Sequence, residues 1–165
     1  MVLSVYKFSF MVEWKTYRLG EVITIKYGKD HKSLSDGPYP VYGSGGVMRH
    51  VEKAIFTEPS ILIPRKGSLN NVLYVDTPFW TVDTMFWSII KTDIVLPHFL
   101  YYLIRDIDFA SLNVGSAVPS LTCPIIEAIE VQIPSIETQH KILNCLEPLD
   151  KKIVLNNRIN HNLAA

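Results

Sequence analysis

The feature that most constrains the fold is a change of hydrophobic period at Ser135. Before it, residues Ile129 to Ile133 alternate between apolar and polar side chains, which is typical of a strand with one solvent-facing side. After it, apolar residues recur at a spacing of four, three and four, which is typical of a helix with one apolar seam. The predicted helix covers Glu137 to Leu163, with Ser135 as its N-cap, and is roughly 40 Å long at 1.5 Å per residue. Such a helix is longer than one small domain needs.

The seam of this helix predicts contact with a partner helix. Two of its members are asparagines, which at such positions fix the register and the number of partners in coiled coils. The predicted interface residues are Ile142, Leu146, Leu149, Ile153, Asn156, Asn160 and Leu163. The alternative is an amphipathic helix packed on its own domain. Pro148 removes a backbone hydrogen bond, so we expect a kink near Asn144.

Upstream of Ser135 the chain consists of short strand-like runs separated by turn residues. β-branched and aromatic residues cluster between glycine, proline and asparagine, as they do in strands. The predicted strands are Val22 to Tyr27, Ile61 to Pro64, Val72 to Val75, Met85 to Ile90 and Ile129 to Ile133. A helix is predicted over Pro97 to Arg105, where proline occupies a favourable first position and the apolar residues share one face.

Composition sets the size of the core and leaves the partners open. The 165 residues, 48% of them hydrophobic, are enough for one well-buried core, which predicts one domain with an appended element rather than two domains. Lys and Arg total 16, as do Asp and Glu, so the net charge of zero does not by itself indicate nucleic acid. The basic residues nevertheless cluster in three segments, residues 26–32, 49–53 and 65–66. The alternative is an ordinary solvated surface.

Cysteine usage and hydropathy predict a protein of the reducing cytoplasm. Cys123 and Cys145 are too few and too far apart for a disulfide framework or a Cys-x-x-Cys metal site. The five histidines show no zinc spacing. No run reaches the roughly 18 apolar residues of a membrane span, and residues Met1 to Phe10 lack a signal-peptide cleavage site.

Complete catalytic motifs are absent from the sequence. Gly43 to Met48 fails the dinucleotide fingerprint because methionine occupies the place of the third glycine, and no P-loop or methyltransferase motif occurs. Ser44 does not lie in a nucleophile elbow. Glu13 to Lys15 and Asp30 to Lys32 match the acid-x-Lys half of a nuclease metal site, a pattern that is frequent by chance. We therefore predict a protein that is not an enzyme and needs no cofactor, with a metal-dependent nuclease as the less favoured alternative.

Residues Tyr39 to Asp83 carry the side chains that indicate a binding function. A Gly-Ser-Gly-Gly turn is followed by two β-rich runs, and the turn between those runs holds residues suited to phosphates and base edges, such as Arg65 for guanine and Asn70 or Asn71 for adenine. The predicted DNA contacts, including one in a later Gly-Ser segment, are Lys29, Lys32, Tyr42, Ser44, Arg49, Arg65, Lys66, Ser68, Asn70, Asn71 and Ser116. The alternatives are a tight turn, a solvated hairpin tip and, for the aromatic residues, the core.

The order of these segments resembles the target recognition domain in DNA specificity subunits of Type I restriction-modification systems. Gly115 to Leu121 is similar to the family's second Gly-Ser signature, and Glu137 to Leu163 is similar to its conserved long helix. Trp14, followed by Leu19-Gly20-Glu21-Val22, is similar to the usual start. The resemblance implies an α+β fold, in which a globular mixed-sheet recognition domain precedes a long C-terminal coiled-coil-type helix. It implies an N-terminal extension (1–12), a recognition domain (13–135) and a dimerisation or spacer helix (136–165).

The same resemblance implies the partners and the division of labour. Specificity subunits of this family hold two recognition domains apart on paired helices, and each domain reads half of an interrupted site in double-stranded DNA. The modification (methyltransferase) and restriction subunits supply the chemistry. With one such domain, the chain is expected to be a half-subunit that dimerises through its helix, or a truncated piece of a longer subunit, which the ending at Asn162 to Ala165 favours. A helix-mediated interaction module without DNA binding is the other alternative.

Overall fold

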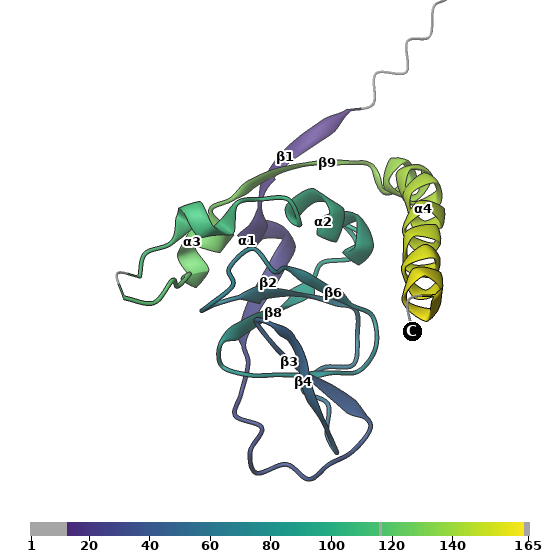
Figure 1. Cartoon of the computed structure of the whole chain (residues 1–165). Helices are drawn as coiled ribbons and strands as arrows, with labels where there is room; N and C mark the ends of the chain where they lie inside the picture. Colours follow the sequence, from purple (N-terminus) through teal and green to yellow (C-terminus); the bar gives the residue numbers. More distant parts are fainter. Residues whose placement is uncertain (1–12, 116, 164–165) are drawn as a thin grey trace, which may run out of the picture.

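The structure is a computed structural model that describes residues 13–115 and 117–163. It confirms the expected α+β class: three small sheets and several short helices form one body, and a long helix ends the described chain (Figure 1). The first and last strands of the body, β1 (Trp14–Arg18) and β9 (Glu130–Pro134), pair in antiparallel fashion, so the two ends of the body lie together. The alternation expected before Ser135 thus forms an actual strand.

A four-stranded antiparallel sheet occupies the centre of the body. Its strand order is β2-β8-β5-β6, and all five residues of β5 are buried. The four strands are β2 (Ile23–Tyr27), β5 (Ser60–Pro64), β6 (Leu73–Val75) and β8 (Met85–Ile90). Each matches a predicted strand to within one residue at either end, because these runs combine β-branched and aromatic residues with clear turn signals.

A three-stranded sheet lies below the central sheet in Figure 1. Its strands are β3 (Tyr39–Gly43), β4 (Gly46–Val51) and β7 (Trp80–Thr81), in the order β4-β3-β7. The hairpin of β3 and β4 is antiparallel with a register shift between Val41 and Tyr42, whereas β7 runs parallel to β3. The turn of this hairpin was predicted from the sequence, whereas its two strands were not.

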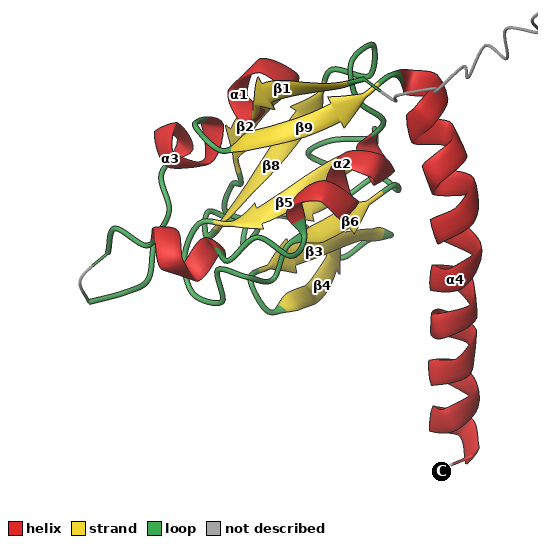
Figure 2. Ribbon diagram, turned by 90° about the horizontal axis from the view of Figure 1, so that it is seen from above, coloured by secondary structure: helices red, strands yellow, loops and turns green. Residues whose placement is uncertain are grey.

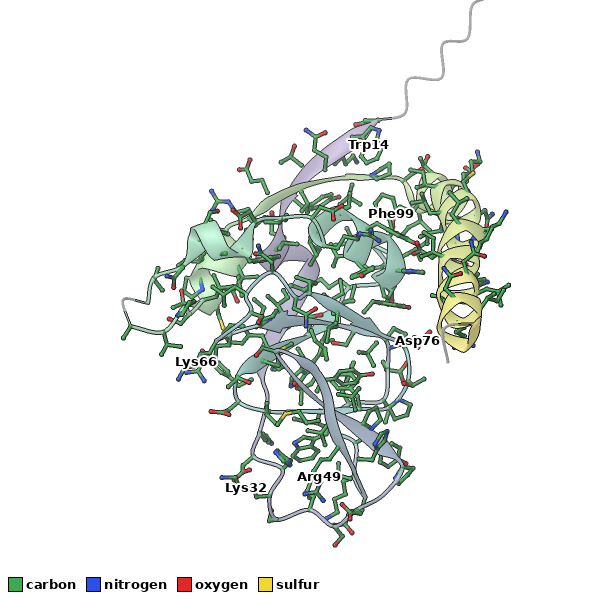
Figure 3. The ribbon with its side chains drawn as sticks, viewed as in Figure 1. Trp14, Lys32, Arg49, Lys66, Asp76 and Phe99 are labelled. Atoms are coloured by element: carbon green, nitrogen blue, oxygen red, sulfur yellow. The ribbon has the colours of Figure 1, made fainter. Side chains whose placement is uncertain are left out.

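Short helices cover the central sheet and complete the main core. They are α1 (Leu19–Val22), α2 (Pro97–Ile104), a 3-10 turn (Phe109–Leu112) and α3 (Cys123–Glu127). The main cluster joins buried residues of these helices to β2, β5, β8 and β9, and it includes Phe99, Phe109 and Leu143. The Trp14 ring on β1 lies 6.4 Å from the ring of Phe99 (Figure 3). Two smaller clusters, around Phe79 and around Val41, support the three-stranded sheet.

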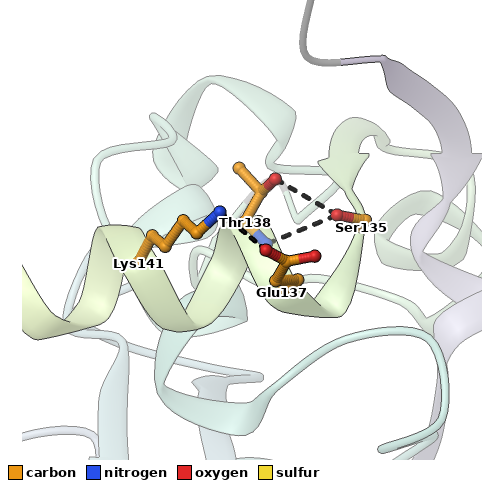
Figure 4. A network of polar contacts seen from close by, with 4 residues as sticks. All are labelled: Ser135, Glu137, Thr138 and Lys141. Carbon is orange, nitrogen blue, oxygen red and sulfur yellow. Dashed lines mark hydrogen bonds and ion pairs between the residues drawn. The ribbon is translucent and has the colours of Figure 1, made fainter. Parts of the chain in front are cut away.

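The long helix α4 (Ile136–Leu163) confirms the predicted change of period. Ser135 caps it, since its Oγ accepts a hydrogen bond from the backbone N–H of Thr138 at 3.3 Å (Figure 4). A Glu137–Lys141 ion pair at 2.6 Å follows in the first turns. Pro148 lies inside the helix, which continues unbroken through it, so the kink expected near Asn144 stays a prediction. Pro148 is exposed, so the carbonyl left without its helical donor can be solvated.

Only the first half of α4 packs on the body. Leu143 is buried in the main core, whereas every residue from Lys151 to Asn156 is exposed. Figure 2 shows the second half of α4 running on beyond the sheets. The helix is therefore anchored at one end and projects at the other.

Candidate nucleic-acid interface

Two turns that are separate in the sequence form one surface. The turn between β3 and β4 contains Ser44, and its carbonyl oxygen accepts a hydrogen bond of 2.7 Å from the side-chain amide of Asn71, which follows β5. Gly67 has a φ of +88°, and a Cβ at that position would lie 2.9 Å from the Ser44 Oγ. The positive φ favours glycine, and the short distance shows how closely the two turns approach each other. The Gly-Ser-Gly-Gly turn and the loop of residues 65–71 thus form a continuous polar surface, which we call the turn surface.

Arg65 and Lys66 are fixed to this surface by their backbones but differ in their side chains. Both backbone N–H groups donate to the carbonyl oxygen of Thr84, at 2.8 and 3.1 Å. The Arg65 guanidinium also donates to the Asp83 carbonyl at 3.0 Å and lies 5.4 Å from the centre of the Tyr27 ring. Arg65 is half-buried, and its orientation is fixed because one of its guanidinium nitrogens already donates to the protein backbone.

The two asparagines of the loop are bonded within the protein. The Asn70 amide donates to the Asp108 carboxylate at 3.1 Å and accepts from the backbone N–H of Ala110 at 2.8 Å, which ties the loop to the 3-10 turn. The Asn71 amide is held by Ser44 as described. A side-chain amide has two N–H donors and an oxygen with two lone pairs, so these bonds do not use either amide completely. The bonds hold the loop in place, and the predicted adenine contacts at both positions stay predictions.

Arg49 and Tyr42 also have partners within the protein. The Arg49 guanidinium forms an ion pair with Asp36 at 2.6 Å and donates to the Leu34 carbonyl at 3.1 Å, which holds the loop before β3 against β4. The Tyr42 ring packs at 6.3 Å from the ring of Phe79, and burial raises the pKa of its hydroxyl. Both side chains thus stabilise the fold, and their predicted DNA contacts stay predictions.

The lysines and Ser68 remain exposed. Among the described residues, Lys29, Lys32 and Lys66 form no ion pair, and all three are exposed, as is Ser68. Lys32 and Lys66 lie on the side of the body away from α4 (Figure 3). Such side chains are suited to phosphate contacts, which position a protein on DNA without reading its sequence. Ser116, the remaining predicted contact, lies outside the described residues.

A cleft beside the turn surface was not foreseen from the sequence. It is lined by residues 30–32, 43–45 and 82–84 together with Met48, and the buried Nδ1 of His31 has no hydrogen-bond partner there. Asp30 turns back on its own loop, because its carboxylate accepts from the Lys32 backbone N–H at 3.0 Å, which lowers its pKa. Tyr27 was also not predicted as part of this surface, where it is exposed next to Arg65. Its position at the end of a strand does not indicate a binding role in the sequence.

Neither a metal site nor a membrane-spanning helix is found among the described residues. In the described part of the chain, no three His, Cys, Asp or Glu side chains come together in a way that could hold a metal ion. Within residues 13–115 and 117–163, no helix combines the length and apolar character needed to cross a bilayer.

The predicted helix interface divides into two parts. Ile142 and Leu146 are half-buried, and Ile142 packs against the main core. The exposed members are Leu149, Ile153, Asn156 and Asn160. Leu163 belongs to the helix, but its side chain lies outside those described. Packing on the chain's own domain therefore accounts for the first half of the seam, and the second half is exposed among the described residues.

The projecting half of α4 carries a second apolar face. Leu149 and Ile153 are 58% and 57% exposed, and Leu155 and Ile159 are 56% and 45% exposed. At 3.6 residues per turn, the second pair lies about a third of a turn around the helix from the first. A helix that is apolar on more than one side is normally buried by more than one neighbour.

The fold matches those of solved specificity subunits. The S subunit of a Type I restriction-modification system from M. genitalium aligns with a TM-score of 0.75 at 18% identity, over 88% of this chain and 41% of that one. The HsdS subunit from Thermoanaerobacter tengcongensis aligns with a TM-score of 0.63 at 16% identity, over 88% and 39%. The described chain therefore has the fold of a part of these subunits.

The sequence comparison leads to the same class. The model of the Type I restriction modification DNA specificity domain matches residues 11–165, and this chain belongs to that family. The HindI specificity subunit of Haemophilus influenzae is 35% identical over 100 residues, which are 55% of this chain and 22% of that protein. The EcoDI specificity subunit of Escherichia coli is 28% identical over 142 residues, which are 84% and 31%. This chain spans less than a third of the length of these two relatives. The family is non-catalytic, in agreement with the prediction from the sequence.

Proposed function

We propose that this chain supplies one target recognition domain of a Type I restriction-modification specificity subunit. In this role it reads one half of an interrupted site in double-stranded DNA and directs modification and restriction subunits to it. Family membership supports the proposal, and so does the exposure of the lysines on one side of the body. Because the DNA target lies in the cell interior, we place the protein in the cytoplasm.

The observation that carries the proposal is the joining of the two turns. The bond of 2.7 Å between Asn71 and Ser44 brings the Gly-Ser-Gly-Gly turn next to Lys66 and Ser68. A rigid, glycine-rich surface with cationic side chains at its edge allows close approach of a protein backbone to a phosphate backbone. The internal bonds of Asn70 and Asn71 support preorganisation of this surface, whereas exposed side chains are left to contact DNA.

A selection experiment tests the proposal. It also distinguishes a half-subunit that pairs with itself from one domain of a longer subunit. The chain is assembled with the modification subunit and incubated with a library of random duplexes at low and moderate salt, and the bound DNA is sequenced. A half-subunit pairing with itself is expected to enrich a split palindrome, because two identical domains related by a two-fold axis read identical half-sites. Enrichment of a single half-site would indicate one domain of a longer subunit. No enrichment at any salt concentration would contradict DNA recognition and favour a pure interaction module.

The projecting half of α4 supports a role in assembly. We propose that the face of Leu149 and Ile153 pairs with a second helix of the same kind, from another copy or another domain. The face of Leu155 and Ile159 would then accept the modification subunit. Two apolar faces that are each about half exposed provide one contact surface for each partner.

Replacing Lys66 with alanine is expected to weaken binding to all DNA sequences by a similar factor. The loss of one phosphate contact should reduce the slope of log K against log salt by about one unit, since one fewer counterion is released. Fluorescence titrations of the assembly at several salt concentrations measure this slope. Lys15→Ala provides the control, because Lys15 lies on β1 beside Trp14, far from Lys66 in Figure 3. Equal slopes for the two variants would show that Lys66 makes no phosphate contact. The phosphate contacts would then have to lie outside the turn surface.

Replacing Asn70 with alanine is expected to lower the free energy of unfolding by about 1–2 kcal/mol, because two hydrogen bonds to the 3-10 turn are lost. The salt slope should remain that of the unchanged assembly. Urea denaturation measures the stability, and Ser68→Ala in the same loop is the control, expected to stay within about 0.5 kcal/mol. Unchanged stability combined with lost discrimination at one adenine position would show instead that this amide reads DNA.

A further inference from the structure

One buried polar side chain, Gln139, attaches the start of α4 to the body. Gln139 is 0% exposed, and its amide makes three hydrogen bonds to backbone groups. Its Oε1 accepts from the N–H of Leu96 at 2.8 Å, and its Nε2 donates to the carbonyl oxygens of Ile94 at 3.0 Å and Pro134 at 2.9 Å. Both amide protons are therefore used, and the side chain connects α4 to the end of β9 and to the loop before α2.

These bonds give a partner to one backbone donor and two backbone acceptors at the place where α4 meets the body. Leu96 is the N-cap residue of α2, and no side chain caps that helix. An apolar side chain in place of Gln139 would fill the volume but leave a donor and two acceptors without this partner. The amide is also directional, so it fixes the angle at which α4 leaves β9 as well as its distance from the body.

A second attachment follows two to three turns further along the same face of α4. Glu147 lies 3.2 Å from His98 of α2, and Asp150 accepts a hydrogen bond from the Tyr102 hydroxyl. The His98 ring is stacked between Tyr74, at 4.6 Å, and Tyr102, at 4.8 Å. After Asp150 the helix leaves the body. The polar attachments at the two levels thus lie within the first 15 residues of α4, and Gln139 is the first of them.

We propose that Gln139 is a positioning residue that sets the direction of α4 relative to the recognition surface. The inference rests on the proposed function, in which the direction of α4 decides where a second recognition domain at the far end lies. From Gln139 to Leu163 the helix extends about 36 Å, so a rotation of about 10° at its base moves the far end by about 6 Å. That displacement corresponds to nearly two base pairs of DNA, at about 3.4 Å each. Gln139 thereby determines which spacing between half-sites is read.

The direct test measures the direction of the helix in the isolated chain and does not require DNA. Nitroxide labels are placed by Lys53→Cys on the body and Arg158→Cys on α4, with Cys123 and Cys145 replaced by serine. The labelled chain is diluted with unlabelled chain, so that only distances within one chain are measured by pulsed electron paramagnetic resonance. Gln139→Met is expected to shift or spread the distance distribution by about 5 Å, because the lever from Gln139 to Arg158 is about 28 Å long.

The controls separate helix direction from loss of folding. Gln132→Met makes the same chemical change at an exposed position of β9 and is expected to leave the distribution unchanged. If Gln139→Met does not fold, Gln139→Asn keeps an amide one methylene shorter, which cannot reach all three backbone partners, and it is expected to give a shift of the same kind. A folded variant with the distribution of the unchanged chain would overturn the proposal.

The functional test uses the complete assembly on its own DNA site. Duplexes carry the two half-sites with the natural spacer, or with one base pair more or fewer, which rotates one half-site by about 35° around the DNA axis. The unchanged assembly should prefer the natural spacer, and Gln139→Met should lose that preference while keeping the half-site sequences. A uniform loss of affinity at all spacers would indicate a merely structural role and overturn the proposal. An assembly that binds no DNA would contradict the proposed function, and the distance measurement would still decide the role of Gln139.

Discussion

Replacing Leu149 and Ile153 with aspartate is expected to abolish self-association of the chain while leaving the body folded. Both side chains are more than half exposed, so more than half of their apolar surface remains to be buried by a partner. Complete burial of a large aliphatic side chain contributes about 1.5–3 kcal/mol, and a two-fold pair buries four of them. Aspartate removes this contribution and places unpaired carboxylates in the contact, so the dissociation constant should rise by about a thousandfold or more.

Sedimentation velocity over a wide range of concentrations measures this change. Asn144→Asp is the control, because it adds a negative charge to an exposed position of α4 on another side of the helix. That variant is expected to associate as the unchanged chain does. Circular dichroism should show the same helix content in all three proteins, since Leu149 and Ile153 lie outside the core. A chain that stays monomeric at high concentration and with the modification subunit present would contradict pairing through α4.

The sequence was sufficient to predict the helices and strands that are determined by local sequence patterns. Strand β5 is a run of apolar residues that ends at Pro64, and α4 has an N-cap at Ser135 and a regular apolar period; both were predicted nearly to the residue. Strand β7 has two residues and pairs with β3, which lies some 40 positions earlier in the chain. Such a strand exists because of its tertiary partner rather than its own propensity, so no local pattern indicates it.

The candidate site was less accessible from the sequence for the same reason. Arg49 and Asn70 were chosen as candidates because their side chains are polar and lie near the turns. Their partners within the protein lie in other segments of the chain. Arg49 bonds to Asp36, and Asn70 bonds to Asp108 and Ala110. A side chain suited to DNA can equally well bond to another segment of the protein, and the sequence alone does not show that segment. The lysines, by contrast, were placed correctly on the surface because ammonium groups are seldom buried.

The helix interface shows how a correct periodicity can have two causes. Ile142 and Leu149 belong to one seam in the sequence, yet the first packs on the body and the second is exposed. The four-three-four spacing predicts an apolar face and does not say what covers it. Gln139 gave no signal at all, because a glutamine in a helix is ordinary unless its three backbone partners are known.

The largest effect on stability is expected at Gly28, which the sequence shows only as the residue after a strand. Its N–H bonds to the Met85 carbonyl at 3.1 Å, and a Cβ at this position would lie 2.0 Å from the carbonyl oxygen of Val82 and 2.5 Å from its carbon. Both atoms belong to the backbone of residues 82–84, which also supports Arg65 and Lys66 through Thr84. Gly28→Ala must therefore displace either the loop of Lys29 or this supporting turn.

We expect Gly28→Ala to lower the free energy of unfolding by about 4 kcal/mol or more, in the range seen when a substitution forces backbone apart in a packed region. Urea denaturation followed by tryptophan fluorescence measures it, since Trp80 donates to the Lys29 carbonyl and reports on the same region. Gly45→Ala is the matched control, because no heavy atom lies within 4 Å of the added carbon, and its effect should stay within about 0.5 kcal/mol. Equal stability of the two variants would show that the Gly28 backbone does not approach residues 81–82 as described, and the joined geometry of the turn surface would then need to be revised.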